Sequence, residues 1–178
     1  MFRPAAASRQ SGRSRRGVGA LALTLLLLAP SGASFGCGSQ VNLKEALAVI
    51  DFRGGWYDAG IVNGKNKLVP SAEFRLEKKT DDRVGPVALS ILFKRLEGGV
   101  EQDFEDVFLQ RVEFTDSNRT TLLKVRPEAG YTGEAPQTRQ QMLENSNFVD
   151  VRAIIFVRQG ATWIELARLD LPRSLIIE

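Results

Sequence analysis

The stretch that decides the fold is FVDVRAIIFVRQGATWIELARLDL, residues 148–171. Apolar side chains occupy every second position through residues 149–157, and Ile154 and Phe156 form a second apolar set between them. Alternation with period two predicts a β-strand, and apolar residues on both faces favour a central place in a sheet. Gly160 then predicts a tight turn into a second strand, because glycine readily adopts positive φ.

The same alternation recurs along the chain and predicts about seven strands, separated by segments rich in Gly, Asn and Pro. Strands of this number and spacing are typical of an all-β fold, and we expect an immunoglobulin-like antiparallel β-sandwich. Pro70 favours an edge or entry position because proline donates no ladder hydrogen bond. The predicted strands are 46–52, 68–78, 87–93, 103–114, 119–125, 148–158 and 161–171.

Residues 126–147 do not alternate and contain two prolines and two glycines. We predict a loop that includes one short helix, Arg139–Glu144, with Thr138 as its N-cap. Connections of this length often carry a function. The simpler interpretation, which we favour, is a crossover from one sheet to the other.

The composition removes several classes of chemistry. The chain has 178 residues, no His and one Cys. These counts exclude a Ser-His-Asp triad, histidine metal ligands, an internal disulfide and cysteine-rich metal sites. No phosphate-binding G-x-x-x-x-G-K-[ST] loop is present. We therefore predict no cofactor, no bound nucleotide and no catalytic residue.

Charge is divided unevenly along the chain. The sequence holds 24 Lys and Arg against 21 Asp and Glu, but residues 1–37 hold five of the arginines and no acid. Residues 38–178 therefore have a small net negative charge. The basic overall balance is thus no argument for nucleic-acid binding by the folded part.

The N-terminus is typical of an export signal. An Arg- and Ser-rich segment (residues 1–17) precedes a 12-residue apolar run (18–29) and a stretch of mostly small residues (30–36) that ends at Cys37. A permanent membrane span needs roughly 20 apolar residues, so a secretory signal fits this pattern better.

The residues Ser34-Phe35-Gly36-Cys37 resemble the lipobox of bacterial lipoprotein precursors, commonly Leu-(Ala/Ser)-(Gly/Ala)-Cys. Gly36 and Cys37 match that pattern, whereas Ser34 and Phe35 depart from it. The resemblance implies a signal peptide over 1–36, a lipid anchor on Cys37 with a short tether over 37–45, and an exported domain over 46–178. It also implies attachment to the cell envelope. Gly38-Ser39 lacks the aspartate of an inner-membrane retention signal, which favours the outer membrane, facing the periplasm.

Two other outcomes stay open at this stage. Cleavage by signal peptidase I close to Cys37 would leave a secreted chain with a free thiol, and an uncleaved signal would act as an anchor. The position of the only cysteine favours lipidation, because an unpaired thiol in an oxidising compartment is a liability.

The candidate binding residues are aromatic. Trp56 and Tyr57 follow Gly54-Gly55, and Tyr131 lies between two glycines. Exposed aromatic rings near a turn can stack on sugars or anchor a partner. Trp56 also continues the apolar face of the preceding strand, which favours the core.

Two function hypotheses follow. The first is a lipid-anchored, non-catalytic binding or assembly module of the cell envelope, with the membrane and an envelope protein as partners. The mature part loosely resembles the small immunoglobulin-like sandwiches of envelope lipoproteins. The alternative is an exported carboxylate-dependent hydrolase or a carbohydrate-binding accessory protein. The hydrolase predicts that Asp103, Glu105 and Asp106 converge in a cleft with Trp56 or Tyr131.

Overall fold

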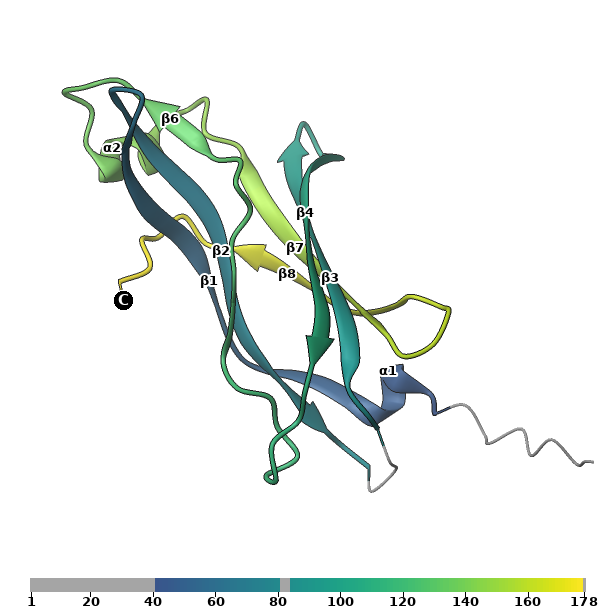
Figure 1. The fold of residues 1–178 in the computed structure, drawn as a ribbon. Helices are drawn as coiled ribbons and strands as arrows, with labels where there is room; N and C mark the ends of the chain where they lie inside the picture. The colour runs from purple at the N-terminus through teal and green to yellow at the C-terminus, as the bar shows by residue number, and fades with distance from the viewer. Residues whose placement is uncertain (1–40, 81–83, 178) are drawn as a thin grey trace, which may run out of the picture. The chain divides into compact units, whose positions relative to one another are not determined.

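The computed structural model describes residues 41–80 and 84–177 of the chain (Figure 1). The predicted signal peptide, Cys37 and the first tether residues lie outside the described residues. None of the helices in the described ranges is long and apolar enough to cross a membrane.

Eight strands in two antiparallel sheets confirm the predicted all-β sandwich over the described residues. Two short helices accompany the strands, where the sequence predicted one helix and about seven strands. The elements are α1 (Leu43–Ala46), β1 (Leu47–Val62), β2 (Lys65–Lys78), β3 (Val87–Glu97), β4 (Val100–Val112), β5 (Leu123–Val125), β6 (Tyr131–Gly133), α2 (Arg139–Glu144), β7 (Asp150–Arg158) and β8 (Ile164–Leu171).

The first sheet has the order β1-β2-β5, and β6 pairs with β2 at a different part of the same edge as β5. The second sheet has the order β4-β3-β7-β8. Three hairpins, β1–β2, β3–β4 and β7–β8, supply most of the strands. These two orders correspond to A-B-E and C′-C-F-G of an immunoglobulin-like sandwich.

β7 is a central strand, as its apolar pattern predicted. It pairs with β3 on one side and with β8 on the other. Val151, Ala153, Ile155 and Val157 face the core, and each has an exposed fraction of 0%. Ile154, on the opposite face of the sheet, is also buried. Burial of the inner face, and of Ile154 on the outer face, explains why apolar residues occupy consecutive positions over 153–157.

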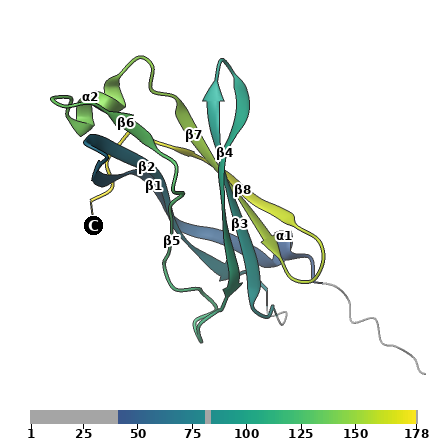
Figure 2. The same cartoon turned by 45° about the horizontal axis from the view of Figure 1, so that its top comes forward.

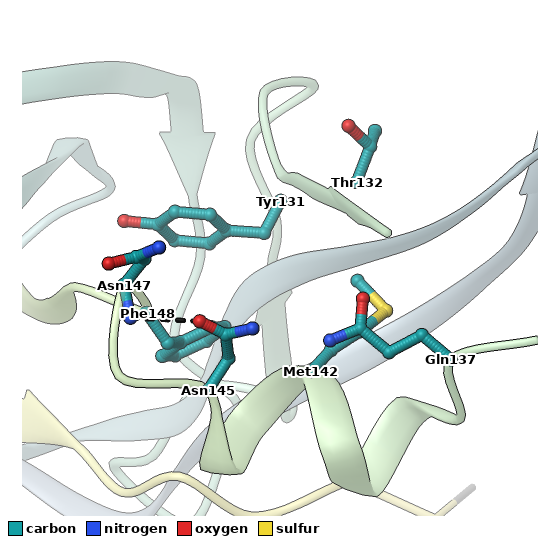
Figure 3. Close-up of a pocket in the computed structure, with 7 residues that line it drawn as sticks. All are labelled: Tyr131, Thr132, Gln137, Met142, Asn145, Asn147 and Phe148. Carbon is teal, nitrogen blue, oxygen red and sulfur yellow. Dashed lines mark hydrogen bonds between the residues drawn. The ribbon is translucent and has the colours of Figure 1, made fainter. Parts of the chain in front are cut away.

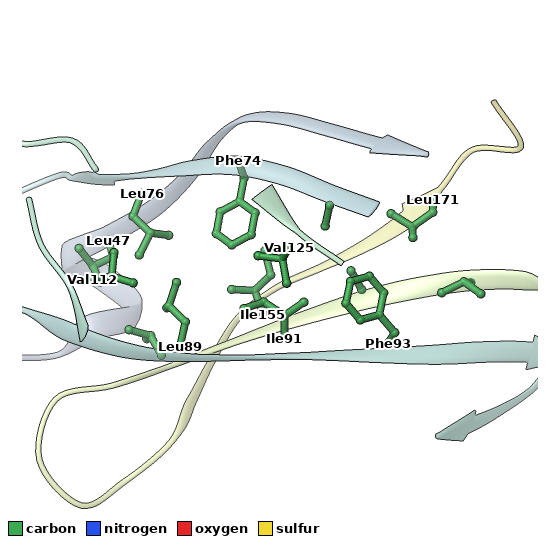
Figure 4. Close-up of a cluster of buried hydrophobic side chains, with 14 of the residues drawn as sticks. Leu47, Phe74, Leu76, Leu89, Ile91, Phe93, Val112, Val125, Ile155 and Leu171 are labelled. Carbon is green, nitrogen blue, oxygen red and sulfur yellow. The ribbon is translucent and has the colours of Figure 1, made fainter. Parts of the chain in front are cut away.

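The core lies between the two sheets and is filled by alternate residues of facing strands (Figure 4). Phe74 and Leu76 of β2 oppose Leu89, Ile91 and Phe93 of β3, and all five are fully buried. Burying an aliphatic or aromatic side chain contributes roughly 1.5–3 kcal/mol, so this layer supplies much of the stability.

β1 is longer than the sequence predicted. The predicted strand ended at residue 52, but β1 continues to Val62 and the turn is limited to Asn63 and Gly64. Two register shifts absorb the irregular residues, one between Ile50 and Arg53 and one between Asp58 and Ile61. A strand with bulges tolerates glycines that would otherwise end it.

Pro70 lies within β2, an interior strand, so the predicted edge or entry position is wrong. Its partner Trp56 directs both backbone groups toward residues 174–176, which makes Trp56–Pro70 a non-hydrogen-bonded pair. The nitrogen of Pro70 therefore faces the opposite edge of β2. There β6 pairs up to Leu68 and β5 begins at Ala72, so Pro70 faces the gap between them.

Residues 126–147 form the predicted crossover between the sheets and contain the predicted helix α2. Thr138 caps α2 in a reciprocal capping box with Gln141. Met142 and Leu143 are buried, as expected. The sequence did not predict β6 in this segment. It also did not predict α1, which is capped by Asn42 and spans the end of the predicted tether and the first residue of the predicted strand 46–52.

Candidate functional site

A cluster of aromatic rings lies at the end of the sandwich that carries β6 and α2. Trp56 has an exposed fraction of 0%, which confirms it as a core residue. Its ring packs edge-on against Phe148, with 4.5 Å between centroids, and lies 5.4 Å from Tyr131. Trp56 therefore supports the site from beneath and is not itself accessible to a ligand.

Tyr131, the first residue of β6, connects this cluster to the surface. Its ring lies 4.6 Å from Phe148, and its hydroxyl donates a hydrogen bond of 3.3 Å to the carbonyl of Val149. Burial raises the pKa of the phenol above its ordinary value of 10.0, and the positive charge of Arg95 opposes that rise. Tyr131 is therefore a neutral hydrogen-bonding group at physiological pH.

A pocket of about 240 Å³ opens beside Tyr131, between β6, α2 and the segment before β7 (Figure 3). The side chains of Tyr131, Met142 and Phe148 form its apolar part. One hydroxyl and three carboxamides provide polar groups, from Thr132, Gln137, Asn145 and Asn147.

Two glycines allow β6 to form the wall of the pocket. A Cβ on Gly130 would collide with the carbonyl oxygen of Leu68 on β2. A Cβ on Gly133 would lie 2.7 Å from Oε1 of Gln137 and 2.9 Å from the Sδ of Met142. Any larger residue at 133 would therefore displace two side chains that line the pocket.

Polar contacts fix α2 against the β1–β2 hairpin. The guanidinium of Arg139 donates to Asn66 Oδ1 at 2.6 Å and to Asp58 Oδ2 at 3.0 Å. The amide nitrogen of Asn66, which is buried, donates to the carbonyl of Gln137 at 2.6 Å. On the other side of α2, Asn145 Oδ1 accepts from the backbone N–H of Asn147 at 2.9 Å. These contacts hold the pocket in shape.

The pocket is lined by neutral groups. The residues that line it include no carboxylate, lysine or arginine, and Tyr131 is kept neutral by burial. Carboxamides and a hydroxyl offer both donors and acceptors. Such a lining matches a neutral ligand that carries hydroxyl or amide groups beside an apolar surface.

Tyr57 lies apart from this pocket. It projects from the outer face of the first sheet, where the guanidinium carbon of Arg126 lies 3.7 Å from the centroid of its ring. Arg126 also pairs at 3.4 Å with Glu73, whose carboxylate is buried. The structure therefore brings Tyr131 and Trp56 together, and places Tyr57 in a separate cation–π and ion-pair arrangement.

The acidic residues of β4 do not converge. Asp103 pairs with Lys94 at 2.9 Å, and Asp106 accepts a hydrogen bond from the hydroxyl of Ser90 at 2.7 Å. Glu105 accepts from two backbone N–H groups, those of Glu128 and Ala129. None of the three lines the pocket at Tyr131, so the predicted shared cleft is wrong.

Comparisons with known protein families, with curated proteins and with solved structures found no match for the chain. Within residues 41–80 and 84–177, no group of three or more Asp, Glu, Cys or His side chains is placed to hold a metal ion.

Sequence reasoning found Tyr131 and missed its polar neighbours. The segment 126–147 is rich in carboxamides and hydroxyls, and it contains all four of these neighbours: Thr132, Gln137, Asn145 and Asn147. That local enrichment was the available signal. It did not indicate a pocket, because the chain path of an irregular segment does not follow from periodicity.

Proposed function

We propose that this protein is an exported lipoprotein, anchored to the cell envelope through Cys37, whose β-sandwich is a non-catalytic binding module. Its contact with a partner is made through the pocket at Tyr131. The lipid anchor rests on the resemblance of residues 34–37 to a lipobox. The binding role rests on the position and the lining of the pocket.

The observation that carries this proposal is the position of the pocket, at the opposite end of the sandwich from the first described residue, Val41. α1 and α2 lie at opposite ends in both views (Figures 1 and 2). Along β1, Leu47 follows α1, and Asp58 pairs with Leu68, which in turn pairs with Tyr131. Eleven residues of strand span roughly 36 Å. A chain tethered before Val41 would thus present the pocket away from the membrane.

The test of the anchor compares the native protein with Cys37→Ser. We expect the native protein in the membrane fraction, with an intact mass that exceeds that of the cleaved polypeptide by its acyl chains. Two or three chains give lasting attachment, whereas one holds only marginally. The intact mass of the Cys37→Ser protein should show no acyl chains. A native protein of unmodified mass in the soluble fraction would contradict the anchor.

The test of the binding module places a photo-activatable residue at the pocket. Position 132 lies on the pocket wall, and position 102 is an exposed site on β4 that serves as the control. In intact cells, we expect a discrete cross-linked species from position 132 and none from position 102. Equal cross-linking from both positions, or none from position 132, would contradict binding through this pocket.

The carbohydrate-binding alternative has one observation in its favour. Three carboxamides and one hydroxyl lie beside an apolar surface, a combination suited to a neutral sugar. The test titrates the Cys37→Ser protein with neutral oligosaccharides and compares Asn147→Ala with the control Gln102→Ala. Loss of one hydrogen bond, about 0.5–1.5 kcal/mol, weakens binding by roughly 2- to 13-fold. If Asn147→Ala and Gln102→Ala bind equally, the sugar does not occupy this pocket.

A further inference from the structure

A group of aromatic and basic side chains lies on the outer face of the second sheet, away from the pocket. Phe108 of β4 and Trp163, just before β8, make an edge-on contact with 5.8 Å between ring centroids. The guanidinium carbon of Arg158 lies 4.6 Å from the centroid of the Trp163 ring. We call these three residues the aromatic patch.

The aromatic patch is open to its surroundings. Phe108 has an exposed fraction of 46%, and Trp163 and Arg158 are half-buried. Phe108 pairs with Ser90, which alternates with the core residues Leu89 and Ile91 and thus faces outward. Over the part of the chain that the structure describes, no carboxylate forms an ion pair with Arg158.

The aromatic patch lies beside the point where the described chain begins. Val41 and Asn42 share a hollow of about 240 Å³ with Gln159 and Thr162 of the turn between β7 and β8. Arg158 and Trp163 are the next residues on either side of that turn. The start of the domain and the aromatic patch therefore belong to one end of the sandwich.

Chain length then limits the distance to the anchor. Cys37 precedes Val41 by four residues, so their Cα atoms are at most about 14 Å apart. A lipid on Cys37 lies in the bilayer, and the surface of that bilayer must approach this end of the sandwich. Tryptophan and phenylalanine suit the boundary between headgroups and acyl chains, and an arginine beside them suits lipid phosphates.

We infer that the aromatic patch contacts the headgroup region of the bilayer in which the Cys37 lipid is inserted. This contact gives the domain a fixed orientation, with the pocket directed away from the membrane. The inference rests on the proposed lipid anchor and adds a second membrane contact to it. The occupant of the patch is the lipid surface itself.

The test uses tryptophan fluorescence, because the chain has two tryptophans of opposite exposure. Trp56 is fully buried, and Trp163 belongs to the aromatic patch. Native lipidated protein is reconstituted into vesicles with and without brominated acyl chains, which quench tryptophan at short range. We expect brominated vesicles to remove most of the Trp163 emission and to leave the emission of Trp163→Phe unchanged.

Two further variants separate the patch from the anchor. Phe108→Ser should reduce the quenching, whereas Ile61→Ser, at an exposed apolar site on the far end of β1, should not. Intact mass is measured on every sample. Lipidated native protein that shows no quenching of Trp163, as when a protein partner covers the patch, would overturn this inference and leave the anchor standing. Native protein of unmodified mass would instead overturn the anchor.

Discussion

Tyr131 is the residue at which the core and the pocket meet. One part of its ring packs with Trp56 and Phe148, and another part lines the pocket. The same burial that fixes the ring also holds the phenol in its neutral form. Because Tyr131 belongs to both, a change in the packing of the core around its ring also changes the wall of the pocket.

The raised pKa of Tyr131 predicts a loss of stability in alkali. The folded state holds the phenolic proton more tightly than the unfolded state, so the contribution of Tyr131 is complete below pH 10.0 and is lost as the pH rises through the folded pKa. Denaturant unfolding measured below and above pH 10.0 should show this loss. In Tyr57→Phe the unfolding free energy should still decrease as the pH rises above 10.0. In Tyr131→Phe this alkaline decrease should be absent. Equal decreases in both variants would contradict it.

At the scale of elements, α2 is the part of the site that the sequence predicted best. Thr138 and Gln141 form a capping box whose spacing is visible in the sequence. We expect Thr138→Ala to lower the unfolding free energy by about 1 kcal/mol, because the backbone N–H of Gln141 loses its acceptor, Thr138 Oγ1. Thr132→Ala, on the pocket wall but outside the cap, should change stability much less. Chemical denaturation of both variants makes the comparison, and similar losses would count against the cap.

The strands β4, β7 and β8 are connected across their outer face by an ion cluster. Arg152 pairs with Asp170 at 2.5 Å and with Glu101 at 2.7 Å, and Arg168 pairs with Glu101 and Glu165. Hydrogen bonds from the arginines hold the pKa values of the three carboxyls below their usual range.

This cluster predicts a loss of stability in acid. A depressed folded pKa contributes stability above the unfolded value, near pH 4, and that contribution disappears as the pH falls through the folded pKa. We expect Arg152→Gln to lose stability less steeply than the native protein below about pH 4.5. Arg111→Gln, which breaks an exposed pair with Glu113, should retain the native slope. Thermal unfolding across this pH range tests it, and identical slopes for Arg152→Gln and the native protein would refute it.

Hydrophobic periodicity predicted the strands in which buried and exposed residues alternate regularly. It failed where bulges or long-range pairing determine the bounds of a strand. The prediction of residues 148–158 matched β7 almost to its bounds because every second residue of that strand is buried. The end of β1 was placed too early because the glycines at positions 54, 55 and 60 are typical of a turn. Gly54 and Gly55 are nevertheless paired with β2, and a register shift accommodates Gly60. Pro70 was misplaced because the gap between β5 and β6 depends on long-range pairing. The pocket depends on the same kind of contact, between a loop and two distant strands.

For the molecule as a whole, residues 174–176 add an isolated parallel bridge to the edge of the first sheet. Ser174 and Ile176 form backbone hydrogen bonds with Trp56, of 2.8 Å and 2.9 Å, along the outer edge of β1. Gly55 permits this approach, since a Cβ there would lie 2.8 Å from the carbonyl oxygen of Ser174. Ile176 is buried against the same region.

Removing residues 174–178 should therefore expose the surroundings of Trp56. In a Trp163→Phe background, where Trp56 is the only tryptophan, we expect a shift of its emission to longer wavelength and a lower unfolding temperature. Ile177→Ser, at a side chain with an exposed fraction of 80%, should produce neither change. An unshifted emission after the longer truncation would show that the C-terminal segment does not protect the core.

This pairing has a consequence for synthesis at the ribosome. The β1–β2 hairpin is made early, yet one edge of it finds its neighbour only when positions 174–176 have been translated. Until then the indole of Trp56 belongs to an unfinished sheet whose backbone groups along that edge are unpaired. Unpaired edges attract other strands. The nascent chain therefore has an unpaired strand edge until residues 174–176 are available, and that edge is open to pairing with other extended segments during that interval.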